Sequence, residues 1–176
     1  MLRILTVVGI CIFFAGCKPP ANVASIDLQK EKSAISSLLD EFERSYSARD
    51  EAGFMKLLST SGDMVWFGTD SAEVIKTDAG WKQQLSDDWM LFSAFKFGPR
   101  ENVSILVDKD GELASVVYEC PTEATIGNQI SRGLFRFAAA LKKENGSWRF
   151  AHGLLAVATT GQSSHELVSK IKTHSM

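Results

Sequence analysis

The sequence has few cysteines, few histidines and no excess of basic residues. Its 176 residues include 3 Cys and 3 His, and 19 Lys and Arg stand against 21 Asp and Glu, which gives a formal charge of −2. A nucleic-acid partner calls for a basic surface, so we predict none. The sequence also has no HExxH, CxxC or Gly-x-Ser-x-Gly motif, no glycine-rich phosphate loop and no metal-ligand spacing among its histidines. We therefore predict no metal site and no cofactor.

The apolar run at the N-terminus is also short. A transmembrane helix needs about 20 apolar residues, whereas the run Ile4 to Phe14 follows Arg3 and stops at Ala15-Gly16-Cys17. A basic start, a short apolar centre and small residues at the end are typical of a secretory signal peptide. We predict that residues 1–16 are such a signal.

The end of this run resembles the lipobox of bacterial lipoproteins, in which Leu-(Ala/Ser)-(Gly/Ala) precedes a lipidated cysteine. Ala15, Gly16 and Cys17 match the pattern, and Phe14 replaces the usual Leu. The resemblance implies lipidation of Cys17. The resemblance also implies a location on the periplasmic side of the outer membrane, because Lys18 rather than Asp follows the cysteine. The alternatives are an ordinary cleaved signal with an incidental cysteine, anchoring in the inner membrane, or secretion.

A short tether and one domain follow the predicted lipidation site. Residues 17–24 contain two consecutive prolines, which keep a linker extended. Residues 25–176 have a length typical of a single domain. If Cys11 leaves with the signal and Cys17 carries lipid, Cys120 has no cysteine partner, and no internal disulfide is possible.

The first half of the domain has helical periodicity. Apolar residues recur at helical spacing in a first helix, at Ile35, Leu38, Leu39, Phe42 and Tyr46. Asp50 can cap a short second helix, and Thr77 or Asp78 can cap a third. The third helix carries apolar side chains on one side, at Trp81, Leu85, Trp89 and Phe92, and its neighbours Asp87 and Asp88 are interpreted as solvated.

The second half has three two-residue turn signals, at Asp110-Gly111, Gly127-Asn128 and Asn145-Gly146. These turns predict an antiparallel meander of four strands, near residues 95–108, 112–126, 129–144 and 147–159. A strand over Met64–Phe67 precedes the third helix, and a last helix is predicted near Ser164–Lys172.

The predicted register separates the two faces of the sheet. A turn at Gly127-Asn128 places Glu119 opposite Arg136, and such opposite-charge pairs stabilise neighbouring strands. Continued to the outer strands, the register puts Tyr118 and His152 on the apolar face that the helices cover. Glu119 and Arg136 then lie on the outer face.

The outer face also carries a flat patch of small apolar residues, and exposed patches of this kind tend to mark association. The patch consists of Leu106, Val117, Ala138, Ala140, Ala151, Gly153, Leu155 and Val157. We expect a homodimer that forms through this outer sheet face.

Three stretches resemble the SnoaL-like branch of the nuclear transport factor 2-like superfamily. They are Asp63–Asp70 (DMVWFGTD), the helix start at Gly80-Trp81, and Gly146–His152 (GSWRFAH). The resemblance covers roughly residues 30–160. It implies an α+β fold in which N-terminal helices pack on a strongly bent antiparallel sheet that forms a cone.

The superfamily includes isomerases, dehydratases and polyketide cyclases as well as non-catalytic binding domains. Its enzymes commonly hold an Asp with a Tyr or His inside the cone. In many SnoaL-like sequences the last strand continues to a second His and then a Ser, where this chain has Leu154 and Ala156. These departures weigh against catalysis.

The candidate ligand-binding residues are Tyr118 and His152 inside the cone and Trp66 and Trp89 at its mouth. We interpret the protein as a lipid-anchored periplasmic domain that binds a small apolar ligand or a protein partner without catalysis. One alternative is a SnoaL-type isomerase, cyclase or dehydratase that uses His152 or Tyr118. A second is an immunity-like protein that binds a partner. A hollow cone would favour a ligand or a substrate, and a filled cone would favour a protein partner.

Overall fold

The computed structural model describes residues 26–174. The predicted signal peptide and the whole tether, residues 17–24 with Cys17, lie outside this range. No helix in the described range is long and apolar enough to cross a membrane.

Three helices precede the main strands. They are α1 (Leu28–Ser47), α2 (Glu51–Met55) and α3 (Asp78–Leu91). Side chains cap all three, as expected of short polar residues at a helix start: Asp27 accepts two backbone N–H groups of α1, Asp50 accepts that of Gly53, and Thr77 accepts that of Gly80. The predicted caps Asp50 and Thr77 are therefore confirmed.

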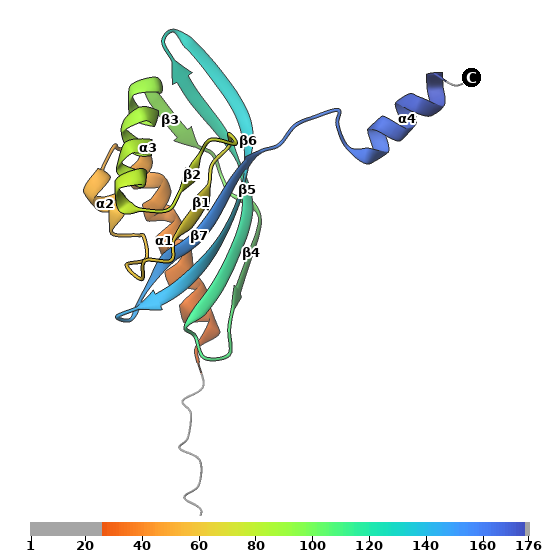
Figure 1. The fold of residues 1–176 in the computed structure, drawn as a ribbon. Helices are drawn as coiled ribbons and strands as arrows, with labels where there is room; N and C mark the ends of the chain where they lie inside the picture. The colour runs from red at the N-terminus through yellow and green to blue at the C-terminus, as the bar shows by residue number, and fades with distance from the viewer. Residues whose placement is uncertain (1–25, 175–176) are drawn as a thin grey trace, which may run out of the picture.

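Seven strands form one curled sheet in the order β2-β1-β7-β6-β5-β3, with β4 also paired to β5. They are β1 (Val65–Phe67), β2 (Val74–Ile75), β3 (Ala94–Phe97), β4 (Glu101–Val107), β5 (Leu113–Ile126), β6 (Gln129–Glu144) and β7 (Ser147–Val157). Strand β1 pairs with β7 in parallel, and the other pairings are antiparallel. Figure 1 shows the three helices on the concave side of this sheet. The predicted α+β architecture is confirmed.

The hairpin between β6 and β7 has the turn that its sequence demands. Asn145 and Gly146 both adopt positive φ angles, of 52° and 77°. A two-residue type I′ turn requires this conformation at both positions, which Asn and Gly tolerate best. The β5–β6 register also matches the prediction, because Glu119 pairs with Arg136 and the Arg136 Nε lies 3.3 Å from Glu119 Oε2.

A bulge in β7 changes the predicted orientation of its second half. Leu141 pairs with Phe150, but Ala140 pairs with His152, so Ala151 is an extra residue between the two pairs. One inserted residue moves every later side chain to the opposite face of the sheet.

The expected inward orientation of His152 is therefore wrong. Its side chain is exposed on the outer face, as is that of Leu154, and its Nδ1 accepts a hydrogen bond from the Val65 N–H at 3.2 Å. Gly153 and Leu155, expected outside, face the helices instead. Gly153 is buried so closely against Trp66 that a Cβ would lie 2.1 Å from the Trp66 Cζ3.

The core lies between α1, α3 and the concave sheet face. Phe42 of α1 lies at its centre. The centroid of the Phe42 ring is 5.1 Å from that of Phe54, 5.5 Å from that of Phe137 and 5.3 Å from that of Phe150. Burial of such aromatic side chains supplies much of the stabilisation of a small domain.

The last helix, α4 (Ser164–His174), stands apart from this core. Figure 1 shows it at the end of a connecting segment that leads away from the sheet. The helix matches the predicted position. Its Leu167 and Val168 side chains are about half exposed.

Candidate functional site

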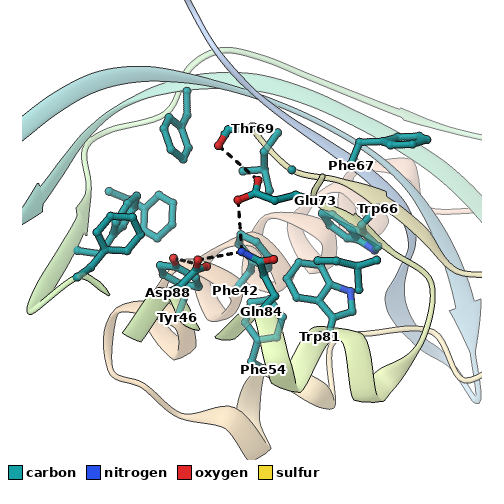
Figure 2. Close-up of a pocket in the computed structure, with 17 residues that line it drawn as sticks. Phe42, Tyr46, Phe54, Trp66, Phe67, Thr69, Glu73, Trp81, Gln84 and Asp88 are labelled. Carbon is teal, nitrogen blue, oxygen red and sulfur yellow. Dashed lines mark hydrogen bonds between the residues drawn. The ribbon is translucent and has the colours of Figure 1, made fainter. Parts of the chain in front are cut away.

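A pocket of about 110 Å³ opens between the helices and the concave sheet face (Figure 2). The described part of the domain is therefore hollow between the helices and the sheet. The sequence did not determine whether such a hollow exists. We call it the aromatic pocket. Its mouth includes the loop between β1 and β2, where Thr69 is exposed and Glu73 is partly buried.

Nine aromatic side chains dominate the wall. Helices α1, α2 and α3 contribute Phe42, Tyr46, Phe54 and Trp81. The sheet and the segment before β3 contribute Trp66, Phe92, Phe95, Phe97 and Phe135. Phe67 also borders the pocket, but its ring turns away in Figure 2. A concave site with apolar walls and a few polar groups is the usual form of a small-molecule site.

The polar groups of the pocket form one hydrogen-bonded chain (Figure 2). The Tyr46 hydroxyl donates to Asp88 Oδ2 at 2.8 Å, and the Gln84 Nε2 donates to Asp88 Oδ1 at 2.9 Å. The same Gln84 nitrogen lies 3.5 Å from Glu73 Oε1, and Thr69 donates to Glu73 Oε2 at 3.4 Å. The chain therefore brings two carboxyl groups to one side of an aromatic cavity.

Burial raises the pKa of Asp88 above the ordinary value of an aspartate. Hydrogen bonds from Tyr46 and Gln84 oppose this shift, whereas the negative charge of Glu73 reinforces it. Burial and the neighbouring Asp88 carboxylate likewise raise the pKa of Tyr46, so its phenol keeps its proton at neutral pH. Asp88 can therefore exchange a proton with a bound molecule closer to neutral pH than a solvated aspartate can.

Two tryptophans in the wall have unsatisfied polar atoms. The buried indole Nε1 groups of Trp66 and Trp81 have no hydrogen-bond partner among the described residues. Buried donors without partners are rare in folded proteins. In Figure 2 both nitrogens lie on the side of their rings away from Tyr46 and Asp88.

The predicted site residues do not come together in one place. Trp66 lines the aromatic pocket, but Trp89 is not among the lining residues. The Trp89 Nε1 instead donates a hydrogen bond to the Tyr46 carbonyl oxygen at 3.0 Å. Tyr118 is buried under α1, where its ring stacks on Phe137. His152 lies on the opposite face of the sheet.

Tyr118 instead belongs to a separate polar cluster. Its hydroxyl donates to Glu43 Oε1 at 3.2 Å, and the Arg100 guanidinium makes two bonds to Glu43, at 2.7 and 2.8 Å. Burial raises the pKa of the neighbouring Cys120 to about 11. This cluster satisfies its own polar groups and joins α1 to the sheet.

The sequence interpretation missed the polar residues of the pocket. The prediction that both Asp87 and Asp88 are solvated is wrong for Asp88, because Asp87 is exposed whereas Asp88 is partly buried. Neighbours on a helix point about 100° apart. Asp88 follows Trp81 by seven residues and Gln84 by four, a spacing that places all three on one helix face. That spacing was the available signal.

No group of three or more His, Cys, Asp or Glu side chains in residues 26–174 is arranged to hold a metal ion.

Solved structures with the same fold share little sequence with this chain. The hexachlorocyclohexane dehydrochlorinase LinA-type3 from Novosphingobium barchaimii aligns with a TM-score of 0.65 at 13% identity, over 74% of this chain and 88% of that one. An NTF2-like protein of unknown function from Pseudomonas putida aligns with a TM-score of 0.62 at 16% identity, over 76% and 91%. A Mycobacterium tuberculosis protein of unknown function aligns with a TM-score of 0.64 at 15% identity, over 77% of this chain and 82% of that one. At such low identity these similarities establish the fold alone.

No curated protein matches the sequence. A family model does: the SnoaL-like domain matches residues 35–160, which include all the described strands, α2, α3, the larger part of α1 and the residues that line the aromatic pocket. The chain therefore belongs to the SnoaL-like domain family and has the NTF2-like fold.

Proposed function

We propose that this protein is a lipid-anchored binding domain that holds a small, mostly apolar molecule in the aromatic pocket. The observation that carries the proposal is the pocket itself, a cavity of about 110 Å³ walled by nine aromatic side chains. A cavity of about 150 Å³ accommodates benzene, so this one suits a compact molecule or one compact end of a larger one. A hollow interior favours a ligand over the alternative of an immunity-like protein partner.

The proposed location rests on the N-terminal sequence. Ala15-Gly16-Cys17 after a short apolar run supports lipidation of Cys17, and Lys18 supports the periplasmic side of the outer membrane. A lipid at Cys17 would hold the domain at the membrane, because only the short tether of residues 17–24 precedes it.

The binding proposal is tested by filling the cavity. Leu155 lines the pocket, whereas Leu154 is exposed on the other face of the same strand. We expect benzene and tert-butanol to shift the indole resonances of Trp66 and Trp81 in the wild type and in Leu154→Phe, but not in Leu155→Phe. The indole of Trp148, which donates to Glu31 elsewhere, serves as the internal reference.

Thermal unfolding of each variant verifies that it is folded. If neither probe shifts Trp66 or Trp81 in the wild type, or if Leu155→Phe binds as well as the wild type, the proposed function is wrong.

A second candidate is a proton-transfer enzyme of the SnoaL type, and the Tyr46–Asp88 pair favours it. A carboxyl group with a raised pKa, in contact with a phenol inside an apolar cavity, can abstract a proton next to a carbonyl group. The residues that would act are Asp88 and Tyr46, not His152 or Tyr118, which do not line this pocket.

Hydrogen–deuterium exchange at the carbon next to the carbonyl of cyclopentanone tests this candidate. We expect Asp88→Asn to lower a catalysed rate by about 10²–10⁴-fold and His152→Ala to leave it unchanged. Exchange no faster with the wild type than with Asp88→Asn would reject catalysis by this pair.

A further inference from the structure

The aromatic pocket has acidic groups and no basic group to balance them. Glu73 and Asp88 line it, and no Lys, Arg or His is among the described residues that do. Neither carboxylate takes part in any of the ion pairs found in residues 26–174. Arg49 comes near the rim, but its guanidinium donates to the carbonyl oxygens of Phe92 and Ser93.

The two carboxylates are held by neutral donors only. Asp88 accepts from Tyr46 and Gln84, and Glu73 accepts from Gln84, from the Thr69 hydroxyl and from a backbone N–H. Both side chains are partly buried, and a carboxylate withdrawn from water is usually paired with a cation, because an unpaired buried charge is costly. These donors orient the oxygens but leave the negative charge of the pocket uncompensated.

The remaining wall is suited to a positive charge as well. The faces of Trp, Tyr and Phe rings attract ammonium groups within about 6 Å, and cages of several rings are used to bind alkylammonium ions. Nine aromatic side chains surround a cavity of only about 110 Å³. An occupant of such a small space cannot lie far from its walls.

From these observations we infer that the aromatic pocket binds a small organic cation, an alkylammonium group that meets Asp88 and Glu73 on one side and aromatic rings on the others. The inference rests on the proposed binding function and narrows it from apolar molecules in general to positively charged ones. A hydrated metal ion is a poor alternative, because the wall offers aromatic carbon where such an ion would need several more oxygen ligands.

A matched pair of probes isolates the effect of charge. The tert-butylammonium ion and tert-butanol have nearly the same size and shape, but only the first is charged at pH 7. We expect the wild type to bind tert-butylammonium about tenfold or more tightly than tert-butanol, as followed by the indole resonances of Trp66 and Trp81. One well-placed opposite charge in a partly buried site is sufficient for a difference of this size.

Two neutralising variants locate the charge that is recognised. Asp88→Asn and Glu73→Gln keep the side-chain shape, and we expect each to weaken tert-butylammonium binding about tenfold while changing tert-butanol binding less than about twofold. Asp87→Asn is the control, since it removes the same charge from the adjacent, exposed position of α3. It should leave the binding of both probes unchanged.

The outcomes separate this inference from the binding proposal. If tert-butanol binds as tightly as tert-butylammonium, or if Asp88→Asn and Glu73→Gln bind the cation as well as Asp87→Asn does, the pocket does not recognise a cation, and the binding proposal survives. If none of benzene, tert-butanol and tert-butylammonium shifts the indole resonances of Trp66 or Trp81, both proposals fail.

Discussion

The Tyr46 hydroxyl donates to Asp88 Oδ2 at 2.8 Å, and this bond joins α1 to α3 across one side of the aromatic pocket. Gln84, one turn before Asp88 on α3, occupies the other carboxylate oxygen at 2.9 Å. Both donors are neutral, so they position the carboxylate without neutralising it. The pair therefore keeps a titratable group inside the domain, and that group makes the stability of the fold depend on pH.

The first prediction concerns this pH dependence. Because the pKa of Asp88 is higher in the folded state than in the unfolded chain, its contribution to stability is fully present below its unfolded pKa, about 3.9. That contribution is lost as the pH rises through the folded pKa. Asp88→Asn has no such group. The free energy of unfolding of the wild type relative to Asp88→Asn should therefore fall as the pH rises from about 4, and then level off.

Urea unfolding at a series of pH values between 4 and 8 measures this difference. Asp87→Asn, which removes an exposed carboxylate one residue earlier, controls for the general loss of a charge. A difference between wild type and Asp88→Asn that stays constant or grows with pH would contradict the raised pKa that partial burial gives Asp88.

The second prediction concerns the close approach of Gly153 to Trp66. A Cβ at position 153 would lie 2.1 Å from Trp66 Cζ3 and 2.3 Å from Cε3. Since Trp66 is 1% exposed and its ring is held against those of Phe42, Trp81 and Phe150, Gly153→Ala should destabilise the protein by about 1–3 kcal/mol through overpacking. Urea unfolding gives the size of the change.

A double-mutant cycle gives the reason for that change. Trp66→Phe removes part of the ring that the new methyl group would meet, so Gly153→Ala should cost less in that background than in the wild type. Additive effects of the two substitutions would show that the cost of Gly153→Ala comes from elsewhere.

The sequence predicted most of the elements because each depends on local chemistry, but it did not indicate β2 and predicted one strand near residues 95–108 where the structure has β3 and β4. Asp50 and Thr77 cap their helices, and Asn145-Gly146 forms the turn between β6 and β7. The register of β5 against β6 followed from one turn and from the opposite charges of Glu119 and Arg136. These features act over a few residues or along one hairpin, so a single sequence is sufficient to show them.

The site was harder to predict, because one local irregularity changes everything beyond it. The bulged residue is Ala151, neither a glycine nor a proline, so the sequence gives no local signal for the bulge. The bulge nevertheless turns His152 outward and Leu155 inward. The hydrogen-bonded chain of the pocket also joins α1 to α3, and the contact between Tyr46 and Asp88 spans 42 positions. Such a pairing depends on how the helices pack on the sheet, which periodicity alone does not determine.

The third prediction concerns the outer face of the sheet, through which we propose that two copies of the chain associate. Ala140 is exposed there, and the nearby Val117 and Leu154 side chains are 48% and 44% exposed. A charge buried at such an interface without a partner costs several kcal/mol. Ala140→Glu should therefore raise the dissociation constant of the dimer by about a hundredfold or more.

Sedimentation velocity over a range of concentrations measures this dissociation. Ser86→Glu is the matched control, because it adds the same charge at an exposed position of α3 on the other side of the domain. It should leave the dimer intact. A wild type that sediments as a monomer at every concentration would rule out the proposed association.

The fourth prediction concerns the N-terminal anchor. If Cys17 is lipidated, cells of a Gram-negative host that are given radioactive palmitate should incorporate it into the wild type, and the protein should fractionate with the outer membrane. Cys17→Ser removes the only thiol at the predicted cleavage site and should abolish both results.

Cys11→Ser is the matched control, because Cys11 lies inside the predicted signal and should be removed with it. Equal labelling of the two variants would place the lipid elsewhere. A wild type found in the periplasm without label would mean that the signal is an ordinary cleaved one.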